Sequence, residues 1–140
     1  MPKRVVFTYG AYDLLHPGHV RFLKRARGLG DSLILALVTD DAIRIVKGNG
    51  KPVMPLKNRV EVMESVRYVD RVMTIDSYNP VPAMEKLKRE GIKIDFLVKG
   101  NDWEYIPGCE YVVRNGGKLV KLHYTGGFST TGMIKKIKGG

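Results

Sequence analysis

The sequence has a single cysteine, few acidic residues and no long hydrophobic run. Cys109 has no second cysteine with which to form an internal disulfide, which is typical of proteins in a reducing compartment. No apolar stretch approaches the roughly 20 residues that a membrane-spanning helix needs, and the short basic start resembles no secretory signal. We therefore expect a cytoplasmic protein with no membrane partner.

Acidic residues are outnumbered by basic ones, with 14 Asp and Glu against 24 Lys and Arg and a formal net charge of +10. Such a surplus suits a polyanionic ligand: a nucleic acid, an anionic membrane surface or a small polyphosphate. Any one of these lysines or arginines is adequately explained as part of a solvated helix face. The large excess of basic over acidic residues nevertheless favours a negatively charged ligand.

Strand-like and helix-like segments alternate along all 140 residues. Pro17 is placed to start one helix, and Asp40 to cap another that ends near Lys47. The alternation predicts a single α/β domain over residues 1–140, a Rossmann-like five-stranded parallel sheet with helices on both faces. The expected strands are 4–8, 33–38, 72–75, 96–98 and 119–122; the expected helices are 17–28, 40–47, 56–66, 81–90 and 130–137.

Ligands of such sheets bind beyond the carboxyl ends of the strands, where the strand order reverses. The segments that follow Thr8, Val38, Val98 and Leu122 are therefore the ones in which to look for a site. The unusual residues of this chain lie in these segments.

The segment after the first strand reads Gly10-Ala-Tyr-Asp-Leu-Leu-His16-Pro-Gly-His19. Its two histidines, three residues apart at a helix start, can face one point. Free amides and the helix dipole attract phosphate there, and Gly18 permits close approach to the backbone. A pair of capping or surface histidines is the simpler interpretation, but the pattern directly after a strand favours a phosphate site. A metal site is a weaker alternative because no cysteine or third histidine lies nearby in the sequence.

A second anion site is predicted at the last helix, where the sequence reads Gly126-Gly-Phe-Ser129-Thr130-Thr131 with lysines one turn later. Hydroxyls and free amides at a helix start can bind phosphate. Ordinary N-capping explains such residues when they occur alone. Their position after the last strand of the same sheet favours the phosphate site.

The two end motifs resemble those of the cytidylyltransferase-like nucleotidyltransferases, and the similarity extends over nearly the whole chain. It also includes Lys47-Gly48, Asn58-Arg59, Val98-Lys-Gly-x-Asp102 and Gly116-Gly117. The resemblance implies that the phosphate of an acceptor attacks the α-phosphorus of ATP or CTP and releases pyrophosphate, with no covalent enzyme intermediate. It further implies Mg²⁺ bound with the triphosphate, no stable nucleic-acid partner, and a homodimer.

The resemblance also implies roles for individual residues. His16 and His19 would stabilise the α-phosphate in the transition state, Lys47 would close on the phosphates from a mobile loop, and Arg59 would lie near the triphosphate. Asp13 would orient the histidine loop and, with Asp40 and Trp103, lie toward the acceptor. Nucleotide binding is expected of Tyr9, Gly10, Ala11, Tyr12, Gly18, Lys99, Gly100, Asp102, Ser129, Thr130 and Thr131.

Three branches of the family differ in their acceptor. The segments 97–102, 108–113 and 129–137 favour the heptose-1-phosphate adenylyltransferases, and Tyr124 stands where the glycerol-3-phosphate cytidylyltransferases usually have an arginine. Arg67-Tyr-Val-Asp70 and Asp102-Trp103 favour that second branch instead, and Trp103 fits either ligand stacking or packing at the rim. Archaeal FAD synthetases share only the first motif well. The interpretation preferred here is a sugar-phosphate adenylyltransferase whose acceptor is similar to heptose 1-phosphate.

Two alternatives of another class are a non-catalytic RNA-binding module and a regulatory protein that binds nucleotide without turnover. The first would need exposed aromatics among the basic residues. Here Phe7, Tyr9, Tyr12, Phe22 and Phe96 fall mostly in strands or motifs instead.

Overall fold

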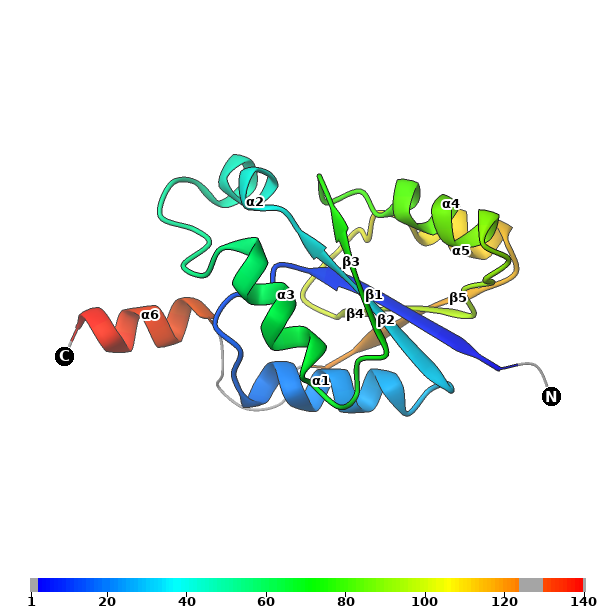
Figure 1. The fold of residues 1–140 in the computed structure, drawn as a ribbon, viewed down its shortest axis with the longest axis horizontal. Helices are drawn as coiled ribbons and strands as arrows, with labels where there is room; N and C mark the ends of the chain where they lie inside the picture. Colours follow the sequence, from blue (N-terminus) through cyan, green and yellow to red (C-terminus); the bar gives the residue numbers. More distant parts are fainter. Residues whose placement is uncertain (1–2, 124–129, 140) are drawn as a thin grey trace.

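The fold, obtained as a computed structural model, describes residues 3–123 and 130–139, without the side chains of 130–133. Five parallel strands form one sheet in the order β3-β2-β1-β4-β5 (Figure 1). The predicted Rossmann-like parallel α/β sheet is confirmed. The strands are β1 (Val5–Gly10), β2 (Ser32–Val38), β3 (Arg71–Ile75), β4 (Phe96–Gly100) and β5 (Lys118–Leu122).

The central strand, β1, pairs with β2 on one side and β4 on the other. The chain therefore builds outward from β1 through β2 to β3 and then crosses back to β4 and β5. Such a reversal leaves a crevice at the carboxyl ends of the two strands that flank it, here β1 and β4.

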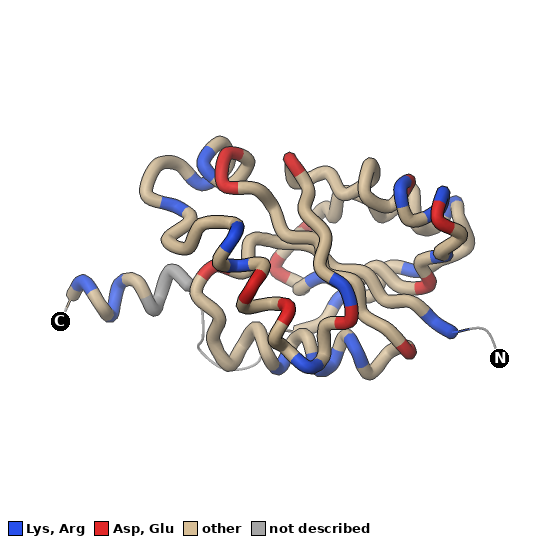
Figure 2. The backbone as a smooth tube through the Cα atoms, viewed as in Figure 1, with Lys and Arg blue, Asp and Glu red and all other residues tan. Residues whose placement is uncertain are grey.

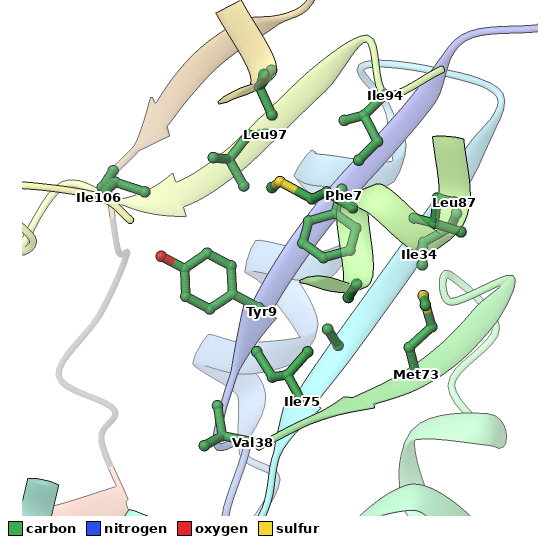
Figure 3. Packing of buried hydrophobic residues seen from close by; sticks show 14 of the residues in the cluster. Phe7, Tyr9, Ile34, Val38, Met73, Ile75, Leu87, Ile94, Leu97 and Ile106 are labelled. Carbon is green, nitrogen blue, oxygen red and sulfur yellow. The ribbon is translucent and has the colours of Figure 1, made fainter. Parts of the chain in front are cut away.

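Helices cover both faces of the sheet because successive side chains of a strand point to opposite faces. The helices are α1 (Pro17–Arg27), α2 (Asp40–Lys47), α3 (Leu56–Glu64), α4 (Val81–Arg89), α5 (Cys109–Arg114) and α6 (Thr130–Lys138). Phe7 and Tyr9 of β1 pack with residues of α2, α4 and α5 in one cluster (Figure 3). Val6, the neighbour of Phe7 along the strand, packs with residues of α1 and α3 in the other.

The last helix, α6, extends away from the sheet on the side of the loop between α2 and α3 (Figure 1). Lys51 of that loop and Ile134 of α6 line a common surface depression. The C-terminal motif thus begins a helix close to the loop that follows Lys47.

Two details of the sequence prediction are wrong. The sequence suggested no helix at Cys109–Arg114, because six residues are too few for a helical period to be recognised and Gly108 before them offers no side-chain cap. Asp40 was expected to cap α2, but Thr39 occupies the cap position and Asp40 is the first helical residue. Asp40 instead forms an ion pair with Arg59.

Candidate active site

A pocket of about 410 Å³ opens at the carboxyl ends of β1 and β4, where the strand order reverses. Its walls come from both faces of the sheet. We call the part formed by Tyr12, His16, His19 and Phe22 the imidazole half, and the part formed by Ile43, Tyr78, Lys99 and Trp103 the lysine half. Predicted site residues that line the pocket are Tyr9, Gly10, Ala11, Tyr12, Asp13, His16, His19, Lys47, Lys99, Asp102 and Trp103.

The two histidines cap α1 reciprocally. The Nδ1 atom of His16 accepts from the backbone N–H of His19 at 3.4 Å, and Nδ1 of His19 accepts from the N–H of His16 at 3.3 Å. The rings stack with centroids 3.7 Å apart. Because both Nδ1 atoms act as acceptors, each neutral ring carries its proton on Nε2, where it can serve as a donor to a ligand.

Burial keeps these rings neutral. Burial, the neighbouring His16 ring and Lys47 lower the pKa of His19 to about 3, and burial also lowers the pKa of His16. The imidazoles therefore offer oriented N–H donors and not positive charge when the pocket holds no anion. Charge for a polyphosphate must come from the neighbouring lysines.

The loop between β1 and α1 has an unusual backbone. Tyr12 and Leu14 have φ of 49° and 50°, in the left-handed region that non-glycine residues seldom occupy. Asp13 lies between them, and its carboxylate accepts from the backbone N–H groups of Val53 and Met54 at 2.6 and 2.8 Å. Asp13 therefore ties the histidine loop to the loop that follows Lys47.

Two lysines of the α2–α3 region line the pocket, Lys47 at the end of α2 and Lys51 in the loop after it. Burial and the proximity of Lys51 lower the pKa of Lys47, while Asp13 and Asp102 act in the opposite direction. The ammonium group of Lys51 disfavours the charge of Lys47, and an anionic ligand bound beside Lys47 would relieve that repulsion.

Arg59 is almost completely buried, and its donors are directed at the protein. It donates to the carbonyl oxygens of Met54, Ala11 and Val38 at 2.8–3.0 Å, and its Nη2 lies 2.6 Å from Asp40. Neither Arg59 nor Asp40 lines the pocket. This arginine joins the ends of β1 and β2 to the start of α3.

Lys99, near the end of β4, is 7% exposed and projects into the lysine half. Its Nζ donates to the carbonyl oxygen of Tyr9 at 2.5 Å and lies 4.2 and 4.5 Å from the ring centroids of Tyr9 and Trp103. Burial lowers its pKa to about 7, with Lys47 acting in the same direction and Asp102 opposing it. Both aromatic faces stabilise the cation that burial disfavours.

Some predicted residues lie elsewhere. Gly18 is buried in the first turn of α1, and Gly100, the last residue of β4, is also buried; neither lines the pocket. Ser129 and Tyr124 lie outside the described residues, as do the side chains of Thr130 and Thr131, whose backbone starts α6.

Sequence reasoning missed five residues that line the pocket. Tyr78 follows β3, and the segment after this strand carries no motif that would mark it as part of a site. Lys51 lies in the stretch between Gly48 and Pro55, which is rich in Gly, Lys and Pro, and a search of that stretch for phosphate-binding lysines could have found it. The apolar members looked like core. The five are Thr8, Phe22, Ile43, Lys51 and Tyr78.

A cytidylyltransferase-like family model matches residues 7–123. The chain belongs to the cytidylyltransferase-like family. It is 39% identical to the bifunctional protein HldE of Alcanivorax borkumensis and 41% identical to that of Citrobacter koseri, each over 138 residues. These matches cover 97% of this chain but 28% of each relative, so the chain spans less than a third of their length.

A solved structure with a similar fold is the lipopolysaccharide core biosynthesis protein of Thermoplasma volcanium. It aligns over 89% of this chain with a TM-score of 0.70, at 24% identity, and so supports the fold. Membership of this family confirms the nucleotidyltransferase class predicted from the sequence. In the described part of the chain, no helix is long and apolar enough to cross a membrane.

Proposed function

We propose that this chain transfers AMP from ATP to the phosphate of a sugar, of the heptose 1-phosphate type, and releases pyrophosphate. The observation that carries the proposal is the reciprocally capped His16–His19 pair, which forms a wall of the pocket at the point of strand reversal. The structural neighbour is named as a lipopolysaccharide core biosynthesis protein, and that name is in keeping with a sugar acceptor. The resemblance of residues 97–102 and 108–113 points the same way.

In the proposed reaction an oxygen of the acceptor phosphate attacks the α-phosphorus of the nucleotide. The bond from that phosphorus to the bridging oxygen breaks, and pyrophosphate leaves with the electron pair. The Nε2–H groups of His16 and His19 would donate to the α-phosphate as its charge rises, where preorganised donors are most effective. Lys47 and Lys51 would neutralise the leaving pyrophosphate.

Mg²⁺ is proposed as the partner of the triphosphate. Among residues 3–123 and 130–139, no group of three or more His, Cys, Asp or Glu is placed to hold a metal ion. Asp102 lines the pocket and supplies a carboxylate of the kind that Mg²⁺ accepts beside phosphate oxygens. The metal, when bound with the nucleotide, would withdraw charge from the leaving group.

The distribution of charge argues against a nucleic-acid groove. Basic residues are spread over α1, α2, α4 and α6 and lie near the N-terminus, and acidic residues interrupt them, among others on α3 (Figure 2). A backbone-tracking site needs a continuous basic stripe. We therefore propose small phosphorylated ligands, a cytoplasmic location and, by analogy with the family, a homodimer.

The test is a pyrophosphate-release screen that crosses ATP and CTP with heptose 1-phosphate, glycerol 3-phosphate and FMN. We expect the highest kcat/KM for ATP with heptose 1-phosphate. A preference for CTP with glycerol 3-phosphate would contradict the proposed acceptor and the proposed nucleotide base, but would agree with the proposed class of reaction. Nucleotide binding without pyrophosphate release in every arm would favour the regulatory alternative.

A further inference from the structure

The pocket joins two halves that belong to opposite faces of the sheet. Tyr12 and Phe22 of the imidazole half pack in the cluster beneath α1 and α3. Ile43, Tyr78 and Trp103 of the lysine half pack in the cluster beneath α2, α4 and α5. If the nucleotide phosphates occupy the start of α1, the lysine half is the space left for the second substrate.

Lys99 lies at the junction of the two halves. A Cβ placed on Gly10, at the end of β1, would be 3.8 Å from its Nζ, so the ammonium group lies beside the loop that leads to the histidines. An incoming phosphate must approach the α-phosphorus to about 3–3.5 Å before it can react. A cation at this junction is well placed to hold that phosphate.

The ammonium group of Lys99 has little compensation for its burial. Its contacts within the described residues are one carbonyl oxygen and two aromatic faces, and no carboxylate lies within ion-pair distance. Arg59 is also buried but has Asp40 and three carbonyl oxygens as partners. An ammonium group has three donors, and the bond to Tyr9 uses one of them.

We propose that Lys99, whose ammonium group lies between Tyr9 and Trp103, binds the phosphate group of the acceptor. It would thereby select acceptors that carry this anion. Trp103 and Tyr78, whose rings contact each other with centroids 5.9 Å apart, would form one wall against the body of the acceptor. The Tyr78 hydroxyl is buried without a hydrogen-bond partner in the described structure, and a polyol or sugar offers one. This inference rests on the proposed function and moves Lys99 from the nucleotide to the acceptor.

Proton uptake on binding is a consequence. With a pKa of about 7, Lys99 is partly neutral at about pH 7.5 in the free enzyme, and a bound phosphate dianion favours its charged form. The charged groups that act on its pKa are Asp102, which raises it, and Lys47, which lowers it. Acceptor binding slightly above neutral pH is therefore expected to take up protons.

The test compares Lys99→Met, which keeps length and removes charge, with Lys88→Met, which removes an ammonium group on α4 outside the pocket. We expect Lys99→Met to raise the KM for heptose 1-phosphate at least about 30-fold and the KM for ATP less than about 3-fold. Lys88→Met should change neither. A rise in the KM for ATP alone would return Lys99 to the nucleotide, and no change in either would leave it a packing residue.

Calorimetry separates this inference from the proposed function. Heptose 1-phosphate is titrated into the nucleotide-bound protein in two buffers of different ionisation enthalpy, with wild type and Lys99→Met. One outcome is that the wild-type protein binds heptose 1-phosphate with proton uptake but turns over no acceptor, and that Lys99→Met loses this binding. The proposed function then fails and the assignment of Lys99 holds. If the acceptor is turned over with equal KM in wild type and variant, the proposed function holds and the assignment of Lys99 fails. Lys99→Gln, which keeps a donor to the Tyr9 carbonyl, replaces Lys99→Met if the latter does not fold.

Discussion

The imidazole half and the lysine half of the pocket present donors of different character to one cavity. His16 and His19 are fixed by reciprocal bonds to the first turn of α1 and are neutral. Lys99 is charged in part, held by one carbonyl oxygen and two rings. A rigid neutral donor suits a transition state whose geometry is fixed, and a cation suits the capture of an anionic ground state. The comparison therefore predicts loss of kcat in one half and loss of acceptor affinity in the other.

The largest effect is expected from the imidazole half. His16→Asn keeps a residue type that caps a helix start but is too short to replace the Nε2 donor, and His19→Ala removes the second Nε2 donor outright. Each should lower kcat roughly 10²- to 10³-fold, as the loss of one preorganised donor does. Pyrophosphate release at saturating substrate measures it, and circular dichroism checks that α1 is retained. Wild-type kcat in either variant would mean that the ring serves only as a cap.

Arg59 provides the next largest effect and tests the contrast between two buried cations. Arg59→Met leaves the carboxylate of Asp40 and the carbonyl oxygens of Ala11 and Val38 without their partner. We expect a loss of about 3 kcal/mol in the free energy of unfolding, measured by urea titration. Lys99→Met is the control and should unfold no more easily than wild type, because it removes a poorly compensated charge. Equal losses in the two variants would contradict the distinction.

The sheet, the first motif and Arg59 show how much of the structure the sequence predicts. Strand and helix alternation was enough to predict the sheet, because burial on both faces leaves uninterrupted apolar runs such as 33–38. The motif at residues 10–19 identified the pocket wall. The resemblance to the family implied a place for Arg59 near the triphosphate, and in the structure its hydrogen bonds run to protein oxygens. A motif gives the residue type at a position but not the direction of its side chain.

Tyr78 is a pocket residue that the sequence did not predict. It lines the pocket from the segment after β3, an edge strand two places from β1. Nothing in the local sequence distinguishes it from a tyrosine at the rim of the core. Its position depends on packing against Trp103, which lies 25 residues later in the sequence and is brought close by the crossover from β3 to β4. Contacts of this kind become apparent only in the folded chain.

The neutrality of the imidazole half predicts acid sensitivity. The pKa of His19 is about 3 in the folded protein and 6.5 without the fold, so the unfolded chain binds a proton first as pH falls. Stability contributed by neutral His19 is present above pH 6.5 and is lost between pH 6.5 and 3. From about pH 7 to about pH 5 the loss is up to about 2 kcal/mol. Urea titrations at the two pH values measure it, and His19→Gln should lose correspondingly less; an equal loss would exclude His19 as the source.

The smallest effect is expected at Asp13, which ties the histidine loop to the loop that follows Lys47. Its two oxygens accept from Val53 and Met54, and Asp13→Asn keeps one acceptor but turns an amide N–H₂ toward the other backbone N–H. The expected cost is about 1 kcal/mol in stability, because one charge-assisted bond is lost and the loop remains attached by the other. Hydrogen exchange at residues 53 and 54 should accelerate, and the KM for ATP should rise several-fold as Lys47 and Lys51 lose their fixed position. If exchange is unchanged while the acceptor KM rises, Asp13 contacts the acceptor directly and does not act as a tie between the loops.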